Sequence, residues 1–194
     1  MTDFIPPAKP LVGDDEIAAV TRVIRSGMLA QGPEVKAFEE EFSAHFGLGR
    51  ACVAVNSGTS GLHLGLLSSG VGAGDEVIVP SFTFAATANS VALTGATPVF
   101  ADIEPDTFCL DPASVEAAIT ERTVGIMPVH LYGHPASMGP LQEIATRHGL
   151  RLFEDAAQAH GASLDGTPVG AFVHFAMFSL YPTKNITSGE GGMV

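Results

Sequence analysis

Residues 76–103 read EVIVPSFTFAATANSVALTGATPVFADI, and the fold class follows from this stretch. Residues 76–80 and 97–103 are short, almost continuously apolar runs, while residues 85–95 between them carry apolar side chains at helical spacing. Strands that are apolar at nearly every position are typical of parallel sheets, which helices cover on both faces. The stretch therefore predicts a strand–helix–strand unit of a mostly parallel sheet.

The same alternation continues on both sides of this unit. Further apolar runs of strand length are residues 51–55, 124–131, 150–155 and 175–181. Helical spacing recurs in residues 14–26, 33–47, 62–70, 111–120 and 138–149. The sequence predicts an α/β fold, and in such folds ligands bind at the carboxyl ends of the strands.

The composition excludes several classes of protein. The chain of 194 residues is long enough for one domain or at most two. Its nine Lys and Arg against 21 Asp and Glu give a net charge of −12, which disfavours nucleic acids and anionic membranes as partners. No apolar run approaches the roughly 18 residues of a transmembrane helix. Cys52 and Cys109 have no zinc or disulfide spacing, which favours a reducing cytoplasm.

The charge content points to assembly. Only 15% of the residues are charged and 46% are hydrophobic, whereas about 25% charged is usual. This balance indicates large buried surfaces or an interface between subunits.

NSGTSG, residues 56–61, joins a predicted strand to a predicted helix. In that place Gly58, Thr59 and Ser60 would present free backbone N–H groups and hydroxyls at a helix N-terminus, which is an arrangement that holds phosphate. The alternative is a plain N-cap, since Ser and Thr also serve that purpose.

Two polar segments follow other apolar runs. Asp155 comes directly after residues 150–154, where a carboxylate needs a partner or serves as a helix N-cap, and Gln158 lies three residues further on. Lys184 follows a strongly apolar stretch, with Ser179 five residues earlier. A partly desolvated lysine has a lowered pKa and can form a Schiff base, although it can also extend its amine from a strand end into solvent.

Histidines do not indicate a metal site. His130 and His134 are four residues apart, but Gly133 and Pro135 argue against the helix that would align them. We therefore expect no bound metal.

The polar segments together match one cofactor. A phosphate cradle, a buried Asp, the aromatic loop PSFTF (residues 80–84) and a late lysine each follow an apolar run. Pyridoxal phosphate requires a lysine for a Schiff base and an acidic partner for its ring nitrogen. These segments predict a pyridoxal phosphate site.

At these residues the sequence resembles the DegT/DnrJ/StrS-type sugar aminotransferases of the aspartate aminotransferase superfamily, fold type I. The resemblance runs from residue 6 to the last residue. It is carried by SGMLAQGPEVKAFEEEF, VNSGTSGLHL, GDEVIVPSFTFAATANSV, PVFADI, PVHLYGHPASM, EDAAQAHGA and FSLYPTKNITSGEGG. It implies a three-layer large domain, a small C-terminal domain that is missing from this chain, and cytoplasmic homodimers with shared active sites.

The resemblance also implies a role for each site residue. Lys184 would form the Schiff base, Asp155 would pair with the ring nitrogen and Gln158 would bond the phenolic oxygen. Phe84 would stack on the ring, and Tyr181 would lie near the sugar. The phosphate would be held by Gly58, Thr59, Ser60 and Ser179.

The implied reaction moves an amino group from a donor such as glutamate to a nucleotide-linked keto-sugar, with pyridoxamine phosphate as the intermediate form of the cofactor. A related deoxysugar dehydratase, which uses pyridoxamine phosphate, has histidine in place of the Schiff-base lysine, so Lys184 argues against it. A regulatory protein that binds the cofactor without catalysis is the other alternative.

The resemblance also predicts how the chain is divided. We expect residues 1–30 to be an N-terminal segment whose helix packs on the large domain, and residues 31–194 to be the cofactor-binding large domain. GEGGMV stops where another strand begins, so we expect a chain that is truncated or is part of a longer protein.

Overall fold

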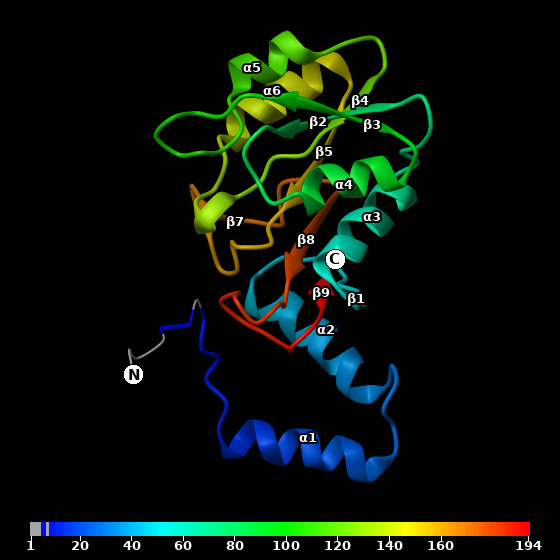
Figure 1. The fold of residues 1–194 in the computed structure, drawn as a ribbon, viewed down its shortest axis with the longest axis vertical. Helices are drawn as coiled ribbons and strands as arrows, with labels where there is room; N and C mark the ends of the chain where they lie inside the picture. The colour runs from blue at the N-terminus through cyan, green and yellow to red at the C-terminus, as the bar shows by residue number, and fades with distance from the viewer. Residues whose placement is uncertain (1–4, 7) are drawn as a thin grey trace.

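A seven-stranded sheet forms the centre of the computed structural model, which describes residues 5, 6 and 8–194 (Figure 1). The strand order is β1-β9-β8-β5-β4-β2-β3. The strands are β1 (Ala54–Val55), β2 (Glu76–Pro80), β3 (Thr97–Ala101), β4 (Thr123–Ile126), β5 (Arg151–Asp155), β8 (Phe175–Ser179) and β9 (Gly192–Met193). A separate hairpin pairs β6 (Ser163–Leu164) with β7 (Thr167–Pro168).

The sheet is mostly parallel, which confirms the predicted fold class. Strands β3, β2, β4, β5 and β8 pair in parallel, in a register that aligns Glu76 with Thr97 and Phe153 with Phe175. β9 pairs antiparallel with β8 and with β1, so that β1 is the strand at the other edge. The carboxyl ends of the parallel strands consequently lie together.

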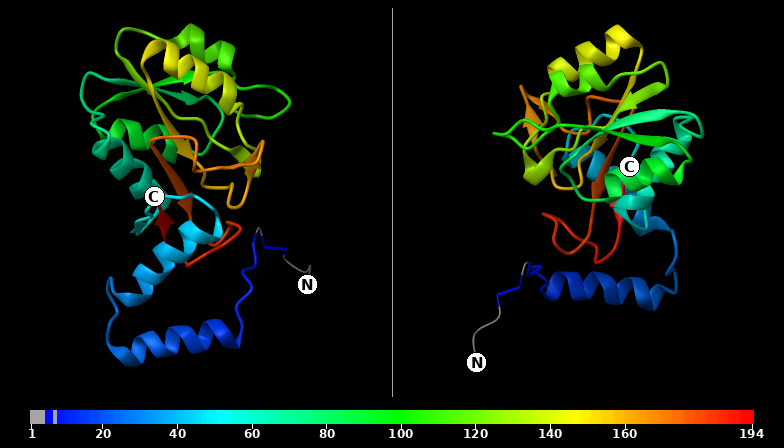
Figure 2. Two further views of the ribbon diagram at one scale, coloured as in Figure 1. Left: turned by 180° about the vertical axis from the view of Figure 1, so that it is seen from behind. Right: turned by 45° about the horizontal axis from the view of Figure 1, so that its top comes forward.

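Helices cover both faces of the sheet (Figure 2). α3 (Gly58–Ser68) and α4 (Ala86–Leu93) pack on one face, and α5 (Pro112–Ala118) and α6 (Met138–His148) pack on the other. α1 (Asp14–Ser26) and α2 (Pro33–His45) precede the first strand, and η1 (Leu131–Gly133) is a single 3-10 turn. This is the three-layer arrangement that the sequence predicted.

Alternation along the strands divides the core into two clusters. Val77 and Val79 of β2 pack with α3 and α4, whereas Ile78 between them packs with α5 and α6. Successive side chains of a strand point to opposite faces, so a strand that is apolar throughout is buried on both sides. All five residues of β2 are buried.

α1 lies apart from the sheet in both views (Figures 1 and 2). It has no buried residue, and Arg22 on it pairs with Glu34 on α2. The positions 1–4 and 7 of the predicted N-terminal segment lie outside the described residues. No helix in the described part of the chain is long and apolar enough to span a membrane.

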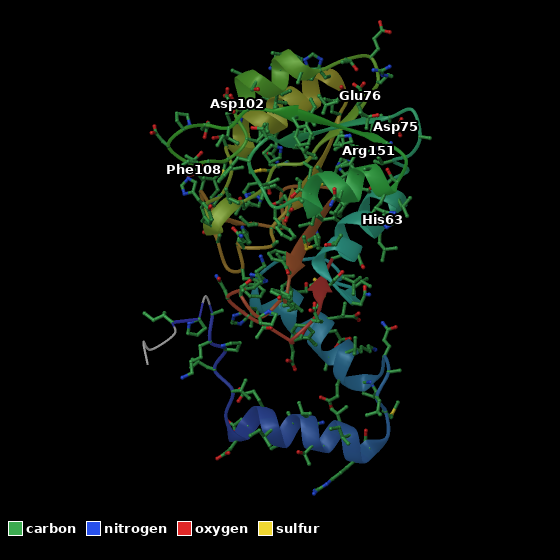
Figure 3. All side chains as sticks on the ribbon, viewed as in Figure 1. His63, Asp75, Glu76, Asp102, Phe108 and Arg151 are labelled. Carbon is green, nitrogen blue, oxygen red and sulfur yellow. The ribbon has the colours of Figure 1, made fainter. Side chains whose placement is uncertain are left out.

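The amino ends of the strands carry structural charges. Figure 3 marks Glu76 and Arg151, which begin β2 and β5. The carboxylate of Glu76 accepts from the Arg122 guanidinium (Nε–Oε1 2.9 Å) and from the Thr120 hydroxyl (2.6 Å). These partners hold the pKa of Glu76 below its ordinary value. Glu76 is thus paired with Arg122, and Arg151 donates to the Ser69 carbonyl.

Candidate functional site

A cavity of about 420 Å³ opens at the carboxyl ends of β5 and β8, beside the N-terminus of α3. Eight of the residues predicted for the site line it. They are Gly58, Thr59, Phe84, Asp155, Gln158, Ser179, Tyr181 and Lys184. The fold thus brings together segments that are far apart in the sequence, as expected for a parallel sheet.

The N-terminus of α3 forms one wall of the cavity. Ser57 caps the helix, because its Oγ accepts from the Ser60 N–H at 3.1 Å. The N–H groups of Gly58 and Thr59, the first two residues of the helix, have no partner within the helix. A Cβ on Gly58 would lie 3.3 Å from Ser179 Oγ, so this hydroxyl is next to the helix end. The N-cap of the helix is thus Ser57, while the Gly58 and Thr59 N–H groups remain unpaired within the helix.

Asp155 ends β5 at the floor of the cavity and is 5% exposed. Thr87 on α4 donates its hydroxyl to Asp155 Oδ2 at 2.8 Å, and the Ala157 N–H donates to Oδ1 at 3.2 Å. Burial raises the pKa of Asp155 above its ordinary value, and these two donors act in the opposite direction. The carboxylate is therefore held in one orientation.

Lys184 lies in the loop between β8 and β9, and its backbone N–H donates to the Tyr181 carbonyl at 2.9 Å. Burial lowers the pKa of its amine, and the Asp155 carboxylate opposes this shift. A lowered pKa increases the fraction of free amine, which is the nucleophilic form. Of the side chains that line the cavity, that of Lys184 is the only one with a cationic group in the described structure.

Gln158 and two aromatic residues also line the cavity. Gln158 Oε1 accepts the backbone N–H of Tyr132 at 2.7 Å. Phe84 is 76% exposed and Tyr181 is 47% exposed, although both line the cavity. These rings present flat apolar surfaces to whatever occupies the cavity.

Ser60 and Thr87 differ from what the sequence indicated. Ser60 does not line the cavity, because its N–H and Oγ are both bonded to Ser57 Oγ. Thr87, which sequence reasoning missed, holds Asp155 from 68 residues away. The only sequence signal for Thr87 was its position three residues after the aromatic loop PSFTF.

The histidines at 130 and 134 do not share a helix face. η1 between them contains Tyr132 in a left-handed conformation (φ 55°). His130 Nε2 instead lies 2.9 Å from Glu154 Oε2, and both side chains are completely buried. Within residues 5, 6 and 8–194, no three His, Cys, Asp or Glu side chains are grouped as metal ligands would be.

The sequence of the chain matches a known family and two curated proteins. The sequence profile of the DegT/DnrJ/EryC1/StrS aminotransferase family matches residues 10–194. The chain is 46% identical over 191 residues to the spore coat polysaccharide biosynthesis protein SpsC of Bacillus subtilis (strain 168), covering 98% of this chain and 49% of SpsC. It is 52% identical over 178 residues to dTDP-3-amino-3,4,6-trideoxy-alpha-D-glucose transaminase of Streptomyces venezuelae, covering 91% of this chain and 47% of that enzyme.

Solved structures share the fold. The PLP form of the putative sugar aminotransferase Spr1654 from Streptococcus pneumoniae superposes on this chain with a TM-score of 0.94 at 35% sequence identity. The match covers 97% of this chain and 52% of that one. A PMP form of the same protein superposes equally well. The chain spans about half the length of the curated relatives it matches.

Proposed function

Because the chain belongs to the DegT/DnrJ/EryC1/StrS aminotransferase family, we propose that it provides the cofactor-binding half of a pyridoxal phosphate-dependent sugar aminotransferase. One observation carries this proposal. Lys184 and Asp155 line a single cavity, and each charge acts on the pKa of the other residue. An amine and a buried carboxylate beside a helix N-terminus are the three groups that the cofactor needs.

The cofactor, when bound, supplies an electron-accepting ring and an aldehyde carbon that receives the amino group. Asp155 is the proposed partner of the ring nitrogen. Its carboxylate is buried, and opposite charges about 4 Å apart attract by about 4 kcal/mol at an effective dielectric constant of ~20. Thr87 and the Ala157 N–H keep the carboxylate oriented for that contact.

The N-terminus of α3 is the proposed phosphate site. Gly58, Thr59 and Ser179 line the cavity together at the end of the helix, and a Cβ on Gly58 would lie 3.3 Å from Ser179 Oγ. A helix N-terminus carries a partial positive charge, which favours an anion. In this arrangement Ser60 supports the site through Ser57 rather than binding phosphate itself.

Lys184 is the proposed attachment point of the cofactor and the proton carrier. With the cofactor bound, the unprotonated Nζ of Lys184 would be the group that accepts and returns a proton. The lowered pKa of Lys184 serves both steps, because the amine must be unprotonated to attack and to act as a base. Phe84 stacks on the ring and Gln158 donates to its phenolic oxygen.

The proposed acceptor is a nucleotide-linked keto-sugar, with glutamate as the donor. A relative named as a dTDP-amino-sugar transaminase supports this class of substrate. Tyr181 at the mouth of the cavity is the proposed contact with the sugar. The protein acts in the cytoplasm in amino-sugar or deoxyamino-sugar biosynthesis, residues 31–194 are its cofactor-binding domain, and no metal takes part.

A homodimer with shared active sites is part of the proposal. The exposed rings of Phe84 and Tyr132 beside the cavity support it, because exposed apolar patches near a site mark interfaces. The interface of the full-length protein is expected to exceed about 2,000 Å². Sedimentation of an active monomer at micromolar concentration would contradict it.

Borohydride reduction tests the site. In the full-length protein loaded with pyridoxal phosphate, reduction should tag Lys184 alone with a pyridoxyl group. Lys9 and Lys36 are internal controls, since both are exposed. Addition of glutamate before reduction should convert the absorbance of the aldehyde form to that of the amine form and prevent labelling. A label on Lys9 or Lys36 would overturn the site, and a spectrum that no amino donor changes would indicate a regulatory protein.

A further inference from the structure

The buried pair His130–Glu154 lies behind the cavity, on the side of the sheet away from it. Val129, Leu131 and Asp155 line the cavity, and His130 and Glu154 alternate with them along the chain. Glu154 and Asp155 are neighbours in β5, and successive side chains of a strand point to opposite faces of the sheet. Both side chains of the pair are completely buried and neither touches the cavity.

The hydrogen bonds of the pair fix the state of the His130 ring. The Ala136 N–H donates to His130 Nδ1 at 3.0 Å, so this nitrogen carries no proton. Nε2 is then the protonated nitrogen, and it donates to Glu154 Oε2 at 2.9 Å. Glu154 also accepts the N–H groups of Gly170 (2.8 Å) and Phe172 (3.2 Å). A carboxylate with three donors is satisfied in the core.

The pair closes a strained turn. His130 and Ala136 are held together by the ring, and the His130 N–H donates to the Asp155 carbonyl at 3.1 Å. Between them, Tyr132 has φ 55°, which is rare for a bulky side chain and costs about 1–3 kcal/mol. Such a conformation persists only where its surroundings enforce it.

The strained residue contacts the site. In its left-handed conformation Tyr132 donates its backbone N–H to Gln158 Oε1 at 2.7 Å. With the amide oxygen occupied in this way, the Gln158 NH₂ group is the end left to donate elsewhere, and Gln158 lines the cavity.

We propose that His130 is a positioning residue for the cofactor: clamped by Glu154 and Ala136, it holds Tyr132 in the conformation that orients the Gln158 amide. This inference rests on the proposed function, because it takes pyridoxamine phosphate as the ligand that Gln158 contacts. His130 itself touches no ligand. Its effect on binding therefore passes through Gln158.

A double-mutant cycle tests the proposal in the full-length protein. The measurement is the dissociation constant of pyridoxamine phosphate for the parent, His130→Asn, Gln158→Ala and the double variant, together with the thermal midpoint of each. Asn can still accept the Ala136 N–H but is too short to reach Glu154. We expect His130→Asn and Gln158→Ala each to weaken binding about tenfold, the loss of one hydrogen bond to a charged group.

The cycle separates positioning from stability. In the Gln158→Ala background His130→Asn should weaken binding by no more than about twofold, while it lowers the thermal midpoint equally in both backgrounds. His148→Asn is the matched control, because His148 forms a similar pair with Glu116 (2.7 Å) on the surface of α5 and α6. It should leave binding unchanged.

Equal weakening by His130→Asn in both backgrounds would overturn the inference, as would no weakening in a folded variant. If His130→Asn does not fold, nitrogen NMR of the parent protein provides the test instead. It should show His130 with a protonated Nε2 and a bare Nδ1, and pyridoxamine phosphate should shift the Gln158 side-chain protons. A doubly protonated ring or an unshifted Gln158 would overturn it. A parent that does not bind pyridoxamine phosphate at all would overturn the proposed function and this inference with it.

Discussion

Thr87 Oγ1 donates to Asp155 Oδ2 across 2.8 Å, which ties the first turn of α4 to the last residue of β5. Thr87 is fully buried, and a second hydroxyl, that of Thr83, lies 3.1 Å from its own. A carboxylate at the floor of a cavity is thus held by a group that never reaches the cavity itself.

Replacement of this hydroxyl should weaken the enzyme. Thr87→Val keeps the shape but removes one of the donors that oppose the effect of burial, so the pKa of Asp155 rises further. A hydrogen bond to a charged group is worth about 1.5–3 kcal/mol, and we expect turnover to fall at least about tenfold. Because more of the carboxyl is protonated at a given pH, the acid limb of the pH–rate profile should move to higher pH. Thr94→Val, which removes bonds only to the Val91 carbonyl and the Ala96 N–H, should change neither quantity.

Asp155→Asn should leave the cofactor bound but remove most of the turnover. An amide cannot stabilise a protonated ring nitrogen, whereas the proposed phosphate site and the stacking of Phe84 do not involve Asp155. Steady-state rates and a cofactor titration of the full-length protein measure the two effects separately. Transamination within about threefold of the parent, or roughly 0.6 kcal/mol, would show that the assignment of Asp155 is wrong.

The partly buried His160 should lower the free energy of unfolding at acid pH. Its ring packs among Phe42, Phe46 and Phe178, and neither ring nitrogen has a hydrogen-bond partner among the described residues. Burial lowers its pKa to about 4 from an ordinary 6.5. Between these values the unfolded chain binds a proton that the folded chain does not, so stability is unaffected above pH 6.5 and falls as the pH drops toward 4.

Urea unfolding at pH 7 and pH 4.5 measures this contribution. In His160→Leu the loss of stability between the two pH values should be smaller by about 1–2 kcal/mol, after allowance for partial exposure of the ring. His174→Gln serves as the control, because the His174 side chain is exposed. An unchanged acid loss in His160→Leu would contradict the prediction.

Gly65 should not tolerate a methyl group. A Cβ there would lie 2.5 Å from the ring of Phe175 on β8, so Gly65→Ala should cost about 1–3 kcal/mol through overpacking. Gly139 on α6 has nothing within 4 Å of the same position. Gly139→Ala should instead stabilise the protein by up to about 1 kcal/mol, since alanine is the better helix former. Thermal midpoints of the two variants should therefore move in opposite directions.

The pattern of apolar residues within each stretch was sufficient to predict most helices and strands and to single out Asp155 and Lys184. β2 begins and ends where the apolar run does, and α1 covers the predicted residues 14–26. Asp155 and Lys184 could be identified because each charge follows an apolar run. The start of α3 was missed by four residues, because the Gly-rich stretch before residue 62 has no helical spacing and becomes helical only through the Ser57 cap.

Contacts between distant segments could not be predicted. The bond from Thr87 to Asp155 depends on the placement of α4 against β5, and a hydrophobic period does not encode that placement. The left-handed Tyr132 likewise follows from clamps at both ends of its turn, not from its own preference. Order among strands is also set by long-range pairing, which is why the antiparallel edge of β9 and β1 was not foreseen.

That edge has a consequence for synthesis on the ribosome. β1 has β9 as its neighbour in the sheet, and the Val53 and Val194 backbones exchange two hydrogen bonds there. The segment that leads into the Ser57 cap must therefore wait, while the chain grows at about 5–20 residues per second, until the last residues of this sequence have left the exit tunnel. The N-terminus of α3 therefore becomes fixed only after the parallel strands between have been made. The nascent chain thus acquires its binding cavity only when the loop that carries Lys184 is also present.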